Sequence, residues 1–433
     1  MTQQTANGTA PKTGLILGYF SILTMLIYLA SPSDYFLDIT TTYMLKNQLQ
    51  ASASQVAMFR LLTALPIYIA FAFGLVRDLW NPFGMRDRGY FLLFALCSAG
   101  VFFFMGVVPV TYGLLFVGML VLMVFARFIN AAYQGLMALI GQEKLMSGRL
   151  SATWLIMGSI PSCIGAFGSG YFSDHVTPSH TFLAMTVIML LLALLSLWKP
   201  SFIYRHTYDQ PLAQSASFVA DVRRLVKHKA IYPAALIMLL FSFAPGSNTP
   251  LQFYLSNELH LSDGIYGYYN AIFNAAFIPT LWLYGFLCTR VRMKTLLWWG
   301  LIITVPQFVP LFFIHSATSA LWMALPIGMM GGLAWAAITD LTMRSCPPGL
   351  QGTVMMLVAG ATLLAQRGGD ILGTYIYDSS PTNGFLYCVI AITVVYLLIL
   401  PLVWFIPREI IATADGQANP LLDEQVLTEI GQA

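Results

Sequence analysis

Residues 74–90 read GLVRDLWNPFGMRDRGY, a polar and basic stretch between two apolar runs that are each long enough to cross a bilayer. Glycine and proline are typical of tight turns, and arginines are retained on the cytoplasmic side of a membrane. The stretch is therefore predicted to be a cytoplasmic loop between the second and third membrane-spanning helices. Asp78 is expected to lie near the positive N-terminal end of the eleventh helix and to hold the cytoplasmic side closed. The gating loop that we assign comprises Gly74, Asp78, Arg86 and Arg88. Alternatively, Arg86 and Arg88 are only the basic residues that any cytoplasmic loop needs.

The composition defines the class of protein. Hydrophobic residues make up 58% of the 433 residues, charged residues only 9%, and the mean hydropathy is +0.73. A soluble domain of this length cannot bury so much apolar surface, so the chain is predicted to be a polytopic protein of the lipid bilayer. The net charge of +3 is small and comes from loops, so no nucleic-acid partner is expected. The five cysteines are scattered singly, which predicts neither a disulfide framework nor a metal site, and we expect no cofactor.

Apolar segments of about 20 residues or more recur along the chain. They span residues 14–45, 54–76, 89–109, 112–139, 150–173, 179–198, 231–256, 264–287, 295–315, 319–342, 350–374 and 384–407. These segments predict twelve transmembrane helices. The predicted divisions are a cytoplasmic tail (1–13), a six-helix bundle (14–198), a cytoplasmic linker (199–230), a second six-helix bundle (231–407) and another cytoplasmic tail (408–433).

Two segments outside the helices have their own patterns. In the linker, apolar residues recur at helical spacing opposite basic ones, namely Phe218, Val219, Val222, Leu225 and Val226 opposite Arg223, Arg224, Lys227 and Lys229. This pattern predicts a short amphipathic helix on the cytoplasmic face. From Ala412 onward the chain is acidic and polar, and it is predicted to be disordered.

The basic residues predict the orientation in the membrane. If the N-terminus is cytoplasmic, most of the 21 Lys and Arg residues fall on the cytoplasmic side, as positive residues do in membrane proteins. Both termini are therefore predicted to be cytoplasmic. The polar residues 1–14 are interpreted as a tail rather than a signal peptide, because the following apolar run is too long and lacks a small-residue cleavage site. We expect a monomer in a bacterial inner membrane.

An internal repeat divides the chain into halves. The run YMLKNQL at residues 43–49 aligns with FYLSNEL at residues 253–259, a displacement of 210 residues. The run GRLS at residues 148–151 aligns with GLQG at residues 349–352, a displacement of 201. The predicted fold class is thus an all-α membrane protein with two pseudo-symmetric six-helix bundles. This is the plan of a major facilitator transporter, in which the substrate site lies near the midplane between the halves.

Charged residues inside membrane segments indicate function, because burying one costs several kcal/mol and needs a partner. Asp34 and Asp38 lie four residues apart in the first segment, just beyond Pro32, which is expected to bend or interrupt the helix. Together with Asp370 they are our candidates for proton coupling. Alternatively, Asp34 and Asp38 lie beyond the hydrocarbon in a solvated helix end. A matching break is predicted at Pro245-Gly246 in the seventh segment.

Two arginines are the main candidates for substrate binding. Arg127 lies near the middle of the fourth segment, and Arg367 lies in the eleventh, one turn from Asp370. Arg367 and Asp370 are alternatively expected to pair only with each other and to serve packing. The other predicted substrate-binding residues are Asn248, Gln252, Tyr254 and Trp335.

These residues together predict a reaction type. Two guanidinium groups in a low-dielectric cavity attract a carboxylate or another delocalised anion through bidentate hydrogen bonds. Carboxylates in the same cavity are suited to bind and release a proton as the site alternates between the two faces. No phosphate-binding G-x-x-x-x-G-K-S/T loop is present, so ATP is not the expected energy source. The sequence therefore predicts proton-coupled symport of a small organic anion.

The loop at residues 74–90 also carries a family resemblance. Its pattern G-x-x-x-D followed by F-G-x-R-x-R-x-Y, together with the run at residues 43–49, resembles the folate-biopterin transporter family of the major facilitator superfamily. The run CPPGLQGT at residues 346–353 is similar to the segment before helix 11 in that family. The resemblance implies a folate- or pterin-like substrate. Three features depart from the family: Asp87 replaces a basic residue, the turn at residues 285–290 has no acid, and Asp34 and Asp38 match no family position.

Other functions stay open at this point. Muropeptide permeases, acetyl-CoA transporters and some siderophore importers share the general loop pattern, so another bulky solute is an alternative substrate. A receptor or scaffold that does not transport is a second alternative. An enzyme is not expected, because the six histidines fall mainly at helix ends and in loops without catalytic or metal-binding partners.

Overall fold

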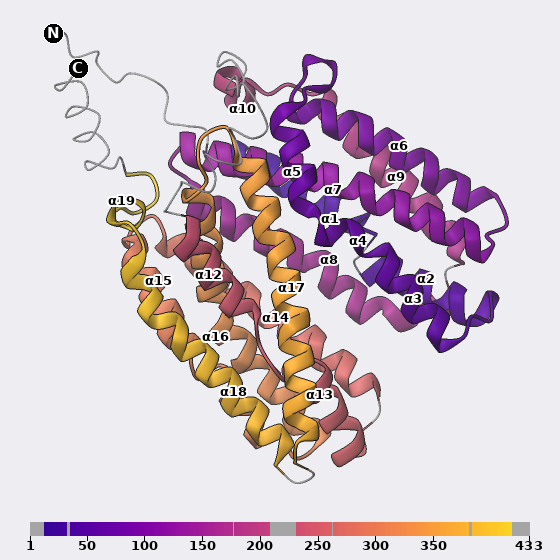
Figure 1. The fold of residues 1–433 in the computed structure, drawn as a ribbon. Coiled ribbons are helices and arrows are strands. Elements are labelled where there is room, and N and C mark those ends of the chain that lie inside the picture. Colours follow the sequence, from indigo (N-terminus) through magenta and orange to yellow (C-terminus); the bar gives the residue numbers. More distant parts are fainter. Residues whose placement is uncertain are drawn as a thin grey trace.

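The computed structural model describes residues 13–32, 35–175, 177–207, 231–261, 263–380 and 383–417, and every regular element in these ranges is helical. The helices form two groups, coloured indigo to magenta and red to yellow in Figure 1. The first group comprises α1 (Thr13–Leu29), α2 (Tyr35–Tyr43), η1 (Met44–Gln48), α3 (Ala53–Thr63), α4 (Leu65–Tyr68), α5 (Ala70–Leu79), η2 (Pro82–Gly84), α6 (Asp87–Val107), α7 (Tyr112–Glu143), α8 (Ser147–His175), α9 (Pro178–Leu197) and α10 (Ser201–Thr207).

The second group also begins with a broken helix that ends in a π-helix. It comprises α12 (Ile231–Ser242), α13 (Thr249–Phe253), η3 (Tyr254–Glu258), α14 (Asp263–Leu287), α15 (Met293–Thr304), η4 (Val309–Phe313), α16 (Ala317–Arg344), α17 (Gln351–Asp378), α18 (Gly384–Ile399), η5 (Leu400–Phe405) and α19 (Arg408–Ile411). Each group is built around an apolar core, to which a few residues of the other group also belong. The all-helical, two-group fold class is the predicted one.

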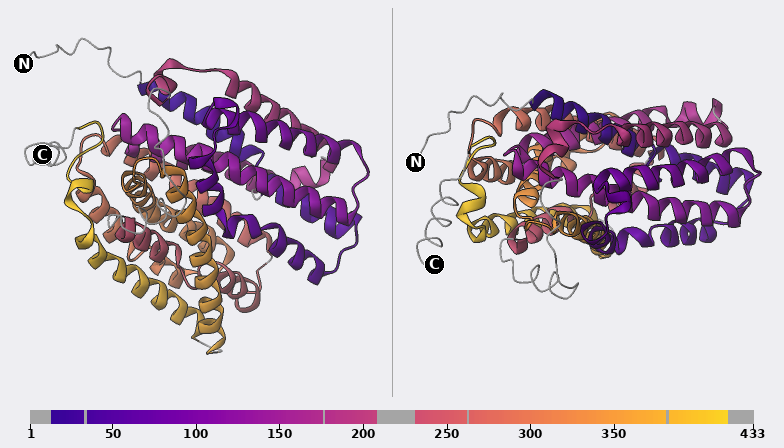
Figure 2. Two further views of the ribbon diagram at one scale, coloured as in Figure 1. Left: turned by 45° about the horizontal axis from the view of Figure 1, so that its top comes forward. Right: turned by 90° about the horizontal axis from the view of Figure 1, so that it is seen from above.

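The two groups lie side by side (Figure 2) and pack closely at one end. We call this the proximal end, where α5 ends and α17 begins, and we call the opposite end, where η1 and η3 lie, the distal end. Helix α17 packs against α5 and α7, while α14 packs against α8. Three helices of the first group and two of the second therefore form most of the contact between the groups.

Membrane crossing is supported by helix length and composition. Among the described residues, seven helical stretches are long and apolar enough to span a bilayer by themselves, and α1 and α12 are shorter apolar helices. Of the other predicted spans, the fifth and the eleventh are the continuous helices α8 and α17, whereas the second is divided into α3, α4 and α5. The chain is thus an integral, multi-pass membrane protein, while the count of twelve helices and the division boundaries stay predictions.

Both predicted helix breaks are confirmed. Helix α1 ends at Leu29 and α2 begins at Tyr35, on either side of Pro32, while α12 ends at Ser242 and α13 begins at Thr249. A proline lacks the backbone N–H that a helix interior requires, so each segment divides there. Gly246 adopts a φ of +98°, a conformation that other residues rarely adopt, and a Cβ there would lie 2.5 Å from the Cβ of Cys388.

The 210-residue repeat is reproduced in unusual backbone geometry. The π-helices η1 and η3 begin 210 residues apart, at Met44 and Tyr254. Each is followed by a residue of positive φ, Gln50 at 50° and His260 at 51°, again 210 residues apart. Because π-helices are rare, this coincidence is strong support for duplicated halves.

The second predicted alignment is wrong by three residues. Helix α8 begins at Ser147 and α17 at Gln351, a displacement of 204 rather than 201. Gly148 is therefore the second residue of its helix and is equivalent to Gly352, whereas Gly349 precedes α17. The connection before α17 is longer than the one before α8, and the sequence runs alone did not reveal this difference.

The predicted disorder from Ala412 onward is corrected for residues 412–417, which we call the 412–417 segment. It follows α19, and Ala414 and Asp415 are buried. The amphipathic-helix prediction at residues 218–229 lies outside the described residues, as does the remainder of the tail.

Candidate functional site

Asp78 connects the two groups at the crossing of α5 and α17. Its carboxylate accepts hydrogen bonds from the backbone N–H groups of Gly352 (3.2 Å) and Thr353 (2.7 Å), the second and third residues of α17, and from the Thr353 hydroxyl (2.6 Å). The side chain is 1% exposed. A carboxylate at this place satisfies N–H groups that have no partner within the helix and interacts favourably with its positive end. The predicted position of Asp78 is confirmed, and we call this contact the α17 closure.

Arg77 completes the α17 closure, although the sequence did not single it out. Its Nη1 donates to Asp78 at 2.7 Å, and its Nε and Nη2 donate to the two oxygens of Asp87 at 2.6 and 2.8 Å. A Cβ on Gly135 of α7 would lie 2.6 Å from the Arg77 guanidinium carbon, so the arginine lies directly on that backbone. The acid at position 87, which departs from the family pattern, therefore provides a second partner for a buried arginine.

Glycines make the crossing of α5 and α17 close. A Cβ on Gly74 would lie 2.7 Å from the carbonyl carbon of Gly352 and 2.8 Å from the Cα of Thr353. A Cβ on Gly352 would lie 2.8 Å from Asp78 Oδ1. The predicted importance of Gly74 thus has a steric basis, since any side chain there separates the two helices.

Arg86 and Arg88 make other contacts. Arg88 Nε and Nη2 donate to the carbonyls of Ser196 and Leu197 at the end of α9, and its guanidinium lies 5.6 Å from the centre of the Tyr204 ring. Arg86 precedes α6, and its backbone N–H donates to Asn81. Arg88 thus stabilises the end of a helix in its own group, so the structural alternative describes its contacts better than the gating assignment does.

A second connection between the groups has the same design. The backbone N–H groups of Gly148 and Arg149, the second and third residues of α8, donate to the two oxygens of Asp415 at 3.1 and 3.3 Å. Arg149 Nε donates to Asp415 at 2.8 Å. Arg344 pairs with Asp340 at 2.8 Å and lies 3.6 Å from Asp415. We call this contact the α8 closure. It could not be predicted from the sequence, because Asp415 lies in the tail that is expected to be disordered.

Burial determines the electrostatics of the α8 closure. It raises the pKa of Asp415 above its ordinary value, and the nearby Asp340 carboxylate raises it further, while Arg149 and Arg344 act in the opposite direction. Two carboxylates and two guanidinium groups are present, so the charges in this cluster balance. Buried clusters of this kind are stable only while every charge keeps its partner.

Gln142 adds a third connection at the proximal end. Its side chain donates to the carbonyls of Met343 and Cys346, both at 2.8 Å, and accepts from the Gln351 side chain at 3.1 Å. The α17 closure, the α8 closure and this amide all lie at the proximal end, where Figure 1 shows α5 and α17 together. Three polar connections thus join the two groups at this end.

Asp38 lies near the distal end and has a partner that the sequence did not reveal. Arg60 Nη2 donates to both Asp38 oxygens at 3.2 and 3.1 Å and to the Thr42 hydroxyl at 2.9 Å. Both charged side chains are about half exposed, at 54% for Arg60 and 52% for Asp38. This exposure fits the solvated-end alternative for Asp38. Asp34 lies outside the described residues.

Asp370 supports the break in the seventh predicted span. Its carboxylate accepts from the backbone N–H of Thr249 at 3.0 Å and from the Thr249 hydroxyl at 2.8 Å, which fixes the start of α13. Asp370 thus binds Thr249, and the alternative that it pairs only with Arg367 is wrong. Arg367 is exposed, as are Asn248 and Gln252, which lie four residues apart at the start of α13. Asn248 and Gln252 lie 210 positions after Asp38 and Thr42, which is the displacement of the internal repeat.

The remaining predicted binding residues are partly buried. Arg127 lies on α7, which packs against α17, the helix that carries Arg367. The Tyr254 ring stacks on Phe385 with centroids 4.1 Å apart, and its hydroxyl donates to the carbonyl of Ile314. Trp335 packs edge-on against Phe277. Tyr254 and Trp335 thus have packing partners in the second group, and their binding role stays a prediction.

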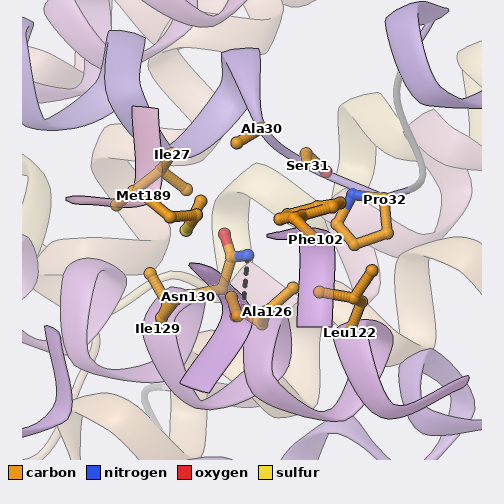
Figure 3. Close-up of a pocket in the computed structure, with 11 residues that line it drawn as sticks. Ile27, Ala30, Ser31, Pro32, Phe102, Leu122, Ala126, Ile129, Asn130 and Met189 are labelled. Carbon is orange, nitrogen blue, oxygen red and sulfur yellow. Dashed lines mark hydrogen bonds between the residues drawn. The ribbon is translucent and has the colours of Figure 1, made fainter. Parts of the chain in front are cut away.

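A small pocket lies inside the first group, beside the break at Pro32 (Figure 3). Four helices line it with mostly apolar side chains: Ile27, Ala30, Ser31, Pro32, Ser98, Phe102, Leu122, Ala126, Ile129, Asn130 and Met189. The Asn130 amide donates to the carbonyl of Ala126 at 2.8 Å. This pocket is distinct from the site that the sequence predicts between the groups. No cluster of three metal-ligating side chains occurs within the ranges that the structure describes.

Comparison with known proteins adds sequence and fold relationships. The BT1 family matches residues 33–424. Folate transporter 2 of Plasmodium falciparum is 20% identical over 390 residues, covering 84% of this chain and 83% of that protein. The folate-biopterin transporter of Synechocystis sp. is 24% identical over 349 residues, covering 76% and 68%. The Escherichia coli fucose:proton symporter FucP shares the fold at a TM-score of 0.69 and 14% identity, covering 91% and 98%.

Proposed function

The chain belongs to the BT1 family, the folate-biopterin transporters of the major facilitator superfamily, and we propose that it moves a folate- or pterin-like organic anion by proton-coupled alternating access. The family and the matched relatives are transporters rather than enzymes, so the protein is a membrane transporter. The family match over residues 33–424 carries the proposal, because it spans both groups of helices.

The closed proximal end supports alternating access. Asp78, Asp415 and Gln142 join the two groups there, and the polar groups predicted to bind substrate lie away from these contacts. In this mechanism a substrate enters from the distal side, and the proximal connections then break so that it can leave. Following the distribution of basic residues, we assign the proximal end to the cytoplasm of a bacterial cell and both termini to the same side. We assign a monomer as the working unit, since a single pair of bundles encloses the predicted path.

The substrate site that we propose lies between the groups, with Arg127 and Arg367 as the anion-binding residues. A guanidinium group holds a carboxylate by two parallel hydrogen bonds, which suits the glutamate portion of a folate. Asn248 and Gln252 are exposed at the start of α13 and provide further donors and acceptors. Tyr254 and Trp335 supply aromatic surface close to the same helices.

Proton coupling is assigned to the carboxylates. Asp38 shares Arg60 with Thr42 in a half-exposed ion pair, so protonation of Asp38 would release Arg60 for an anion. Asp370 holds the start of α13 through Thr249, so its protonation would free the broken helix to move. Asp34 is included with Asp38 because the two lie one helical turn apart in sequence.

The first test is ligand binding by the purified protein. Folates, pterins, muropeptides and siderophores are added separately while the melting temperature is measured, because a ligand that binds the native state raises it. A shift with folates or pterins alone supports the proposed substrate class. A shift only with a muropeptide or siderophore would replace that class with another bulky solute, and vesicles that show no uptake of any of them would favour a receptor.

The second test is uptake of the stabilising ligand into vesicles under a pH gradient. Arg127→Ala and Arg367→Ala are each expected to reduce uptake by roughly 30-fold or more, since removing the partner of a buried charge costs about 2 kcal/mol or more. Arg292→Ala, at an exposed arginine before α15, is the matched control.

The double replacement Asp34→Asn with Asp38→Asn is expected to abolish pH-driven accumulation and to spare exchange. Normal uptake by any of these variants removes that residue from the site.

A further inference from the structure

The 412–417 segment occupies the position where the duplicated half lacks an acid. Asp78 lies at the end of α5, and the residue 210 positions later, Cys288, lies directly after α14. A Cβ on Gly148 would lie 2.9 Å from the Cβ of Cys288, just as a Cβ on Gly352 would lie 2.8 Å from Asp78 Oδ1. Cys288 is therefore the structural counterpart of Asp78, and a thiol cannot replace a carboxylate at the start of a helix.

Asp415 supplies the missing carboxylate. Its backbone N–H donates to the Cys288 carbonyl at 2.8 Å, which places its side chain over the start of α8. It binds the second and third residues of α8, just as Asp78 binds the second and third residues of α17. In both closures the side chain of the third residue also donates, from Arg149 in one case and Thr353 in the other.

The segment joins the two groups through its backbone as well. The Thr413 carbonyl accepts from the Met293 N–H at 3.3 Å and from Arg344 Nη1 at 3.2 Å, both in the second group. The Gly416 N–H donates to the Leu145 carbonyl at 2.6 Å in the first group. A movement that separates α8 from α14 must therefore break the bonds of Asp415 or carry the segment away with one group.

We propose that the 412–417 segment is a latch, in which Asp415 holds the proximal end closed on α8 and must leave it before that end can open. The proposal rests on the alternating access assigned above. Asp415 is a gating residue that acts on α8 and does not contact the substrate path. Without the Asp415 carboxylate, only the negative charge of Asp340 is left for the two positive charges of Arg149 and Arg344. The charge balance of the α8 closure is then lost.

The test uses Cys288, which is 2% exposed beneath the latch. Cys97, Cys163, Cys346 and Cys388 are replaced by alanine in the full chain, and the rate of modification of Cys288 by N-ethylmaleimide is measured in detergent. Asp415→Asn is expected to raise this rate five-fold or more. Glu143→Gln, at an exposed carboxylate at the proximal end of α7, is the matched control. Its rate of Cys288 modification is expected to stay within two-fold of the parent rate.

A second reporter separates opening from general unfolding. With Cys97 on α6 as the single thiol instead, Asp415→Asn is expected to leave the rate unchanged. An unaltered rate at Cys288, or an equal rise at Cys97, would overturn the latch. Neither measurement uses a substrate, so a failure of the proposed folate transport leaves this result intact, and a failure of the latch leaves the substrate tests intact.

Discussion

At the proximal end, Asp78 binds the start of α17 and Asp415 binds the start of α8, each through the second and third residues of the helix. The two closures differ in the origin of the carboxylate. Asp78 belongs to α5, whose packing against α17 fixes it, whereas Asp415 belongs to a short segment held by a few hydrogen bonds. The comparison teaches that duplicated halves need the same charge at a helix start, and that the chain can supply it from a distant part of its sequence.

The surroundings of the two closures also differ. The α17 closure packs backbone against backbone, because Gly74 and Gly352 bring two helices together. In the α8 closure, Gly148 faces the side chains of Cys288 and Asp340 instead. Side chains adjust more readily than backbone, so we expect the α17 closure to be the more rigid of the two.

The largest effect is expected from Asp78→Asn, which breaks the α17 closure. It removes one of the two carboxylates that partner Arg77, and losing a partner from a buried ion pair costs about 3–5 kcal/mol. Cys346, which is 3% exposed beside this closure, should react with maleimide at least about ten-fold faster, and uptake should fall by a similar factor. Asp378→Asn at the exposed distal end of α17 is the control. Wild-type labelling and uptake in Asp78→Asn would show that the closures do not gate the protein.

A smaller, graded effect distinguishes the two kinds of packing. Gly74→Ala places a Cβ against the Gly352 and Thr353 backbone, whereas Gly148→Ala meets only side chains. Overpacking a close contact lowers the free energy of unfolding by about 1–3 kcal/mol. We expect the loss for Gly74→Ala to lie near the upper end of this range and the loss for Gly148→Ala near the lower end. The measurement is the melting temperature, with Gly100→Ala on α6 as a control whose Cβ points into open space. A larger fall in melting temperature for Gly148→Ala than for Gly74→Ala would contradict the proposed difference in rigidity.

The smallest effect is a partial restoration. In an Asp415→Asn background, Cys288→Asp returns a carboxylate to the counterpart of Asp78, facing the start of α8. Because Asp415→Asn opens the proximal end, we expect it to raise the rate of Cys346 labelling as well. Cys288→Asp should bring that rate back at least halfway to the parent value, with Cys288→Asn as the uncharged control. Equal labelling with Asp and Asn at position 288 would count against the equivalence of the two closures.

Sequence reasoning was most successful where the physics is local. The apolar segments predicted an all-helical membrane fold, prolines predicted both breaks, and the run at residues 43–49 predicted a repeat that reappears in the π-helices. The loop at residues 74–90 predicted Asp78 at the start of α17. Each of these inferences depends on neighbouring residues, whose spacing can be read directly.

Only the tertiary structure decided which distant residues became partners. Arg60 with Asp38, Asp370 with Thr249, and Asp415 with Arg149 are separated by 22, 121 and 266 positions in the chain. No periodicity links such pairs, because a charge in an apolar environment is satisfied by whichever partner the packing of helices brings within hydrogen-bonding distance. For this protein the sequence determined the helices and one acid that binds a helix start of the other group, while the packing of the two groups determined the second one.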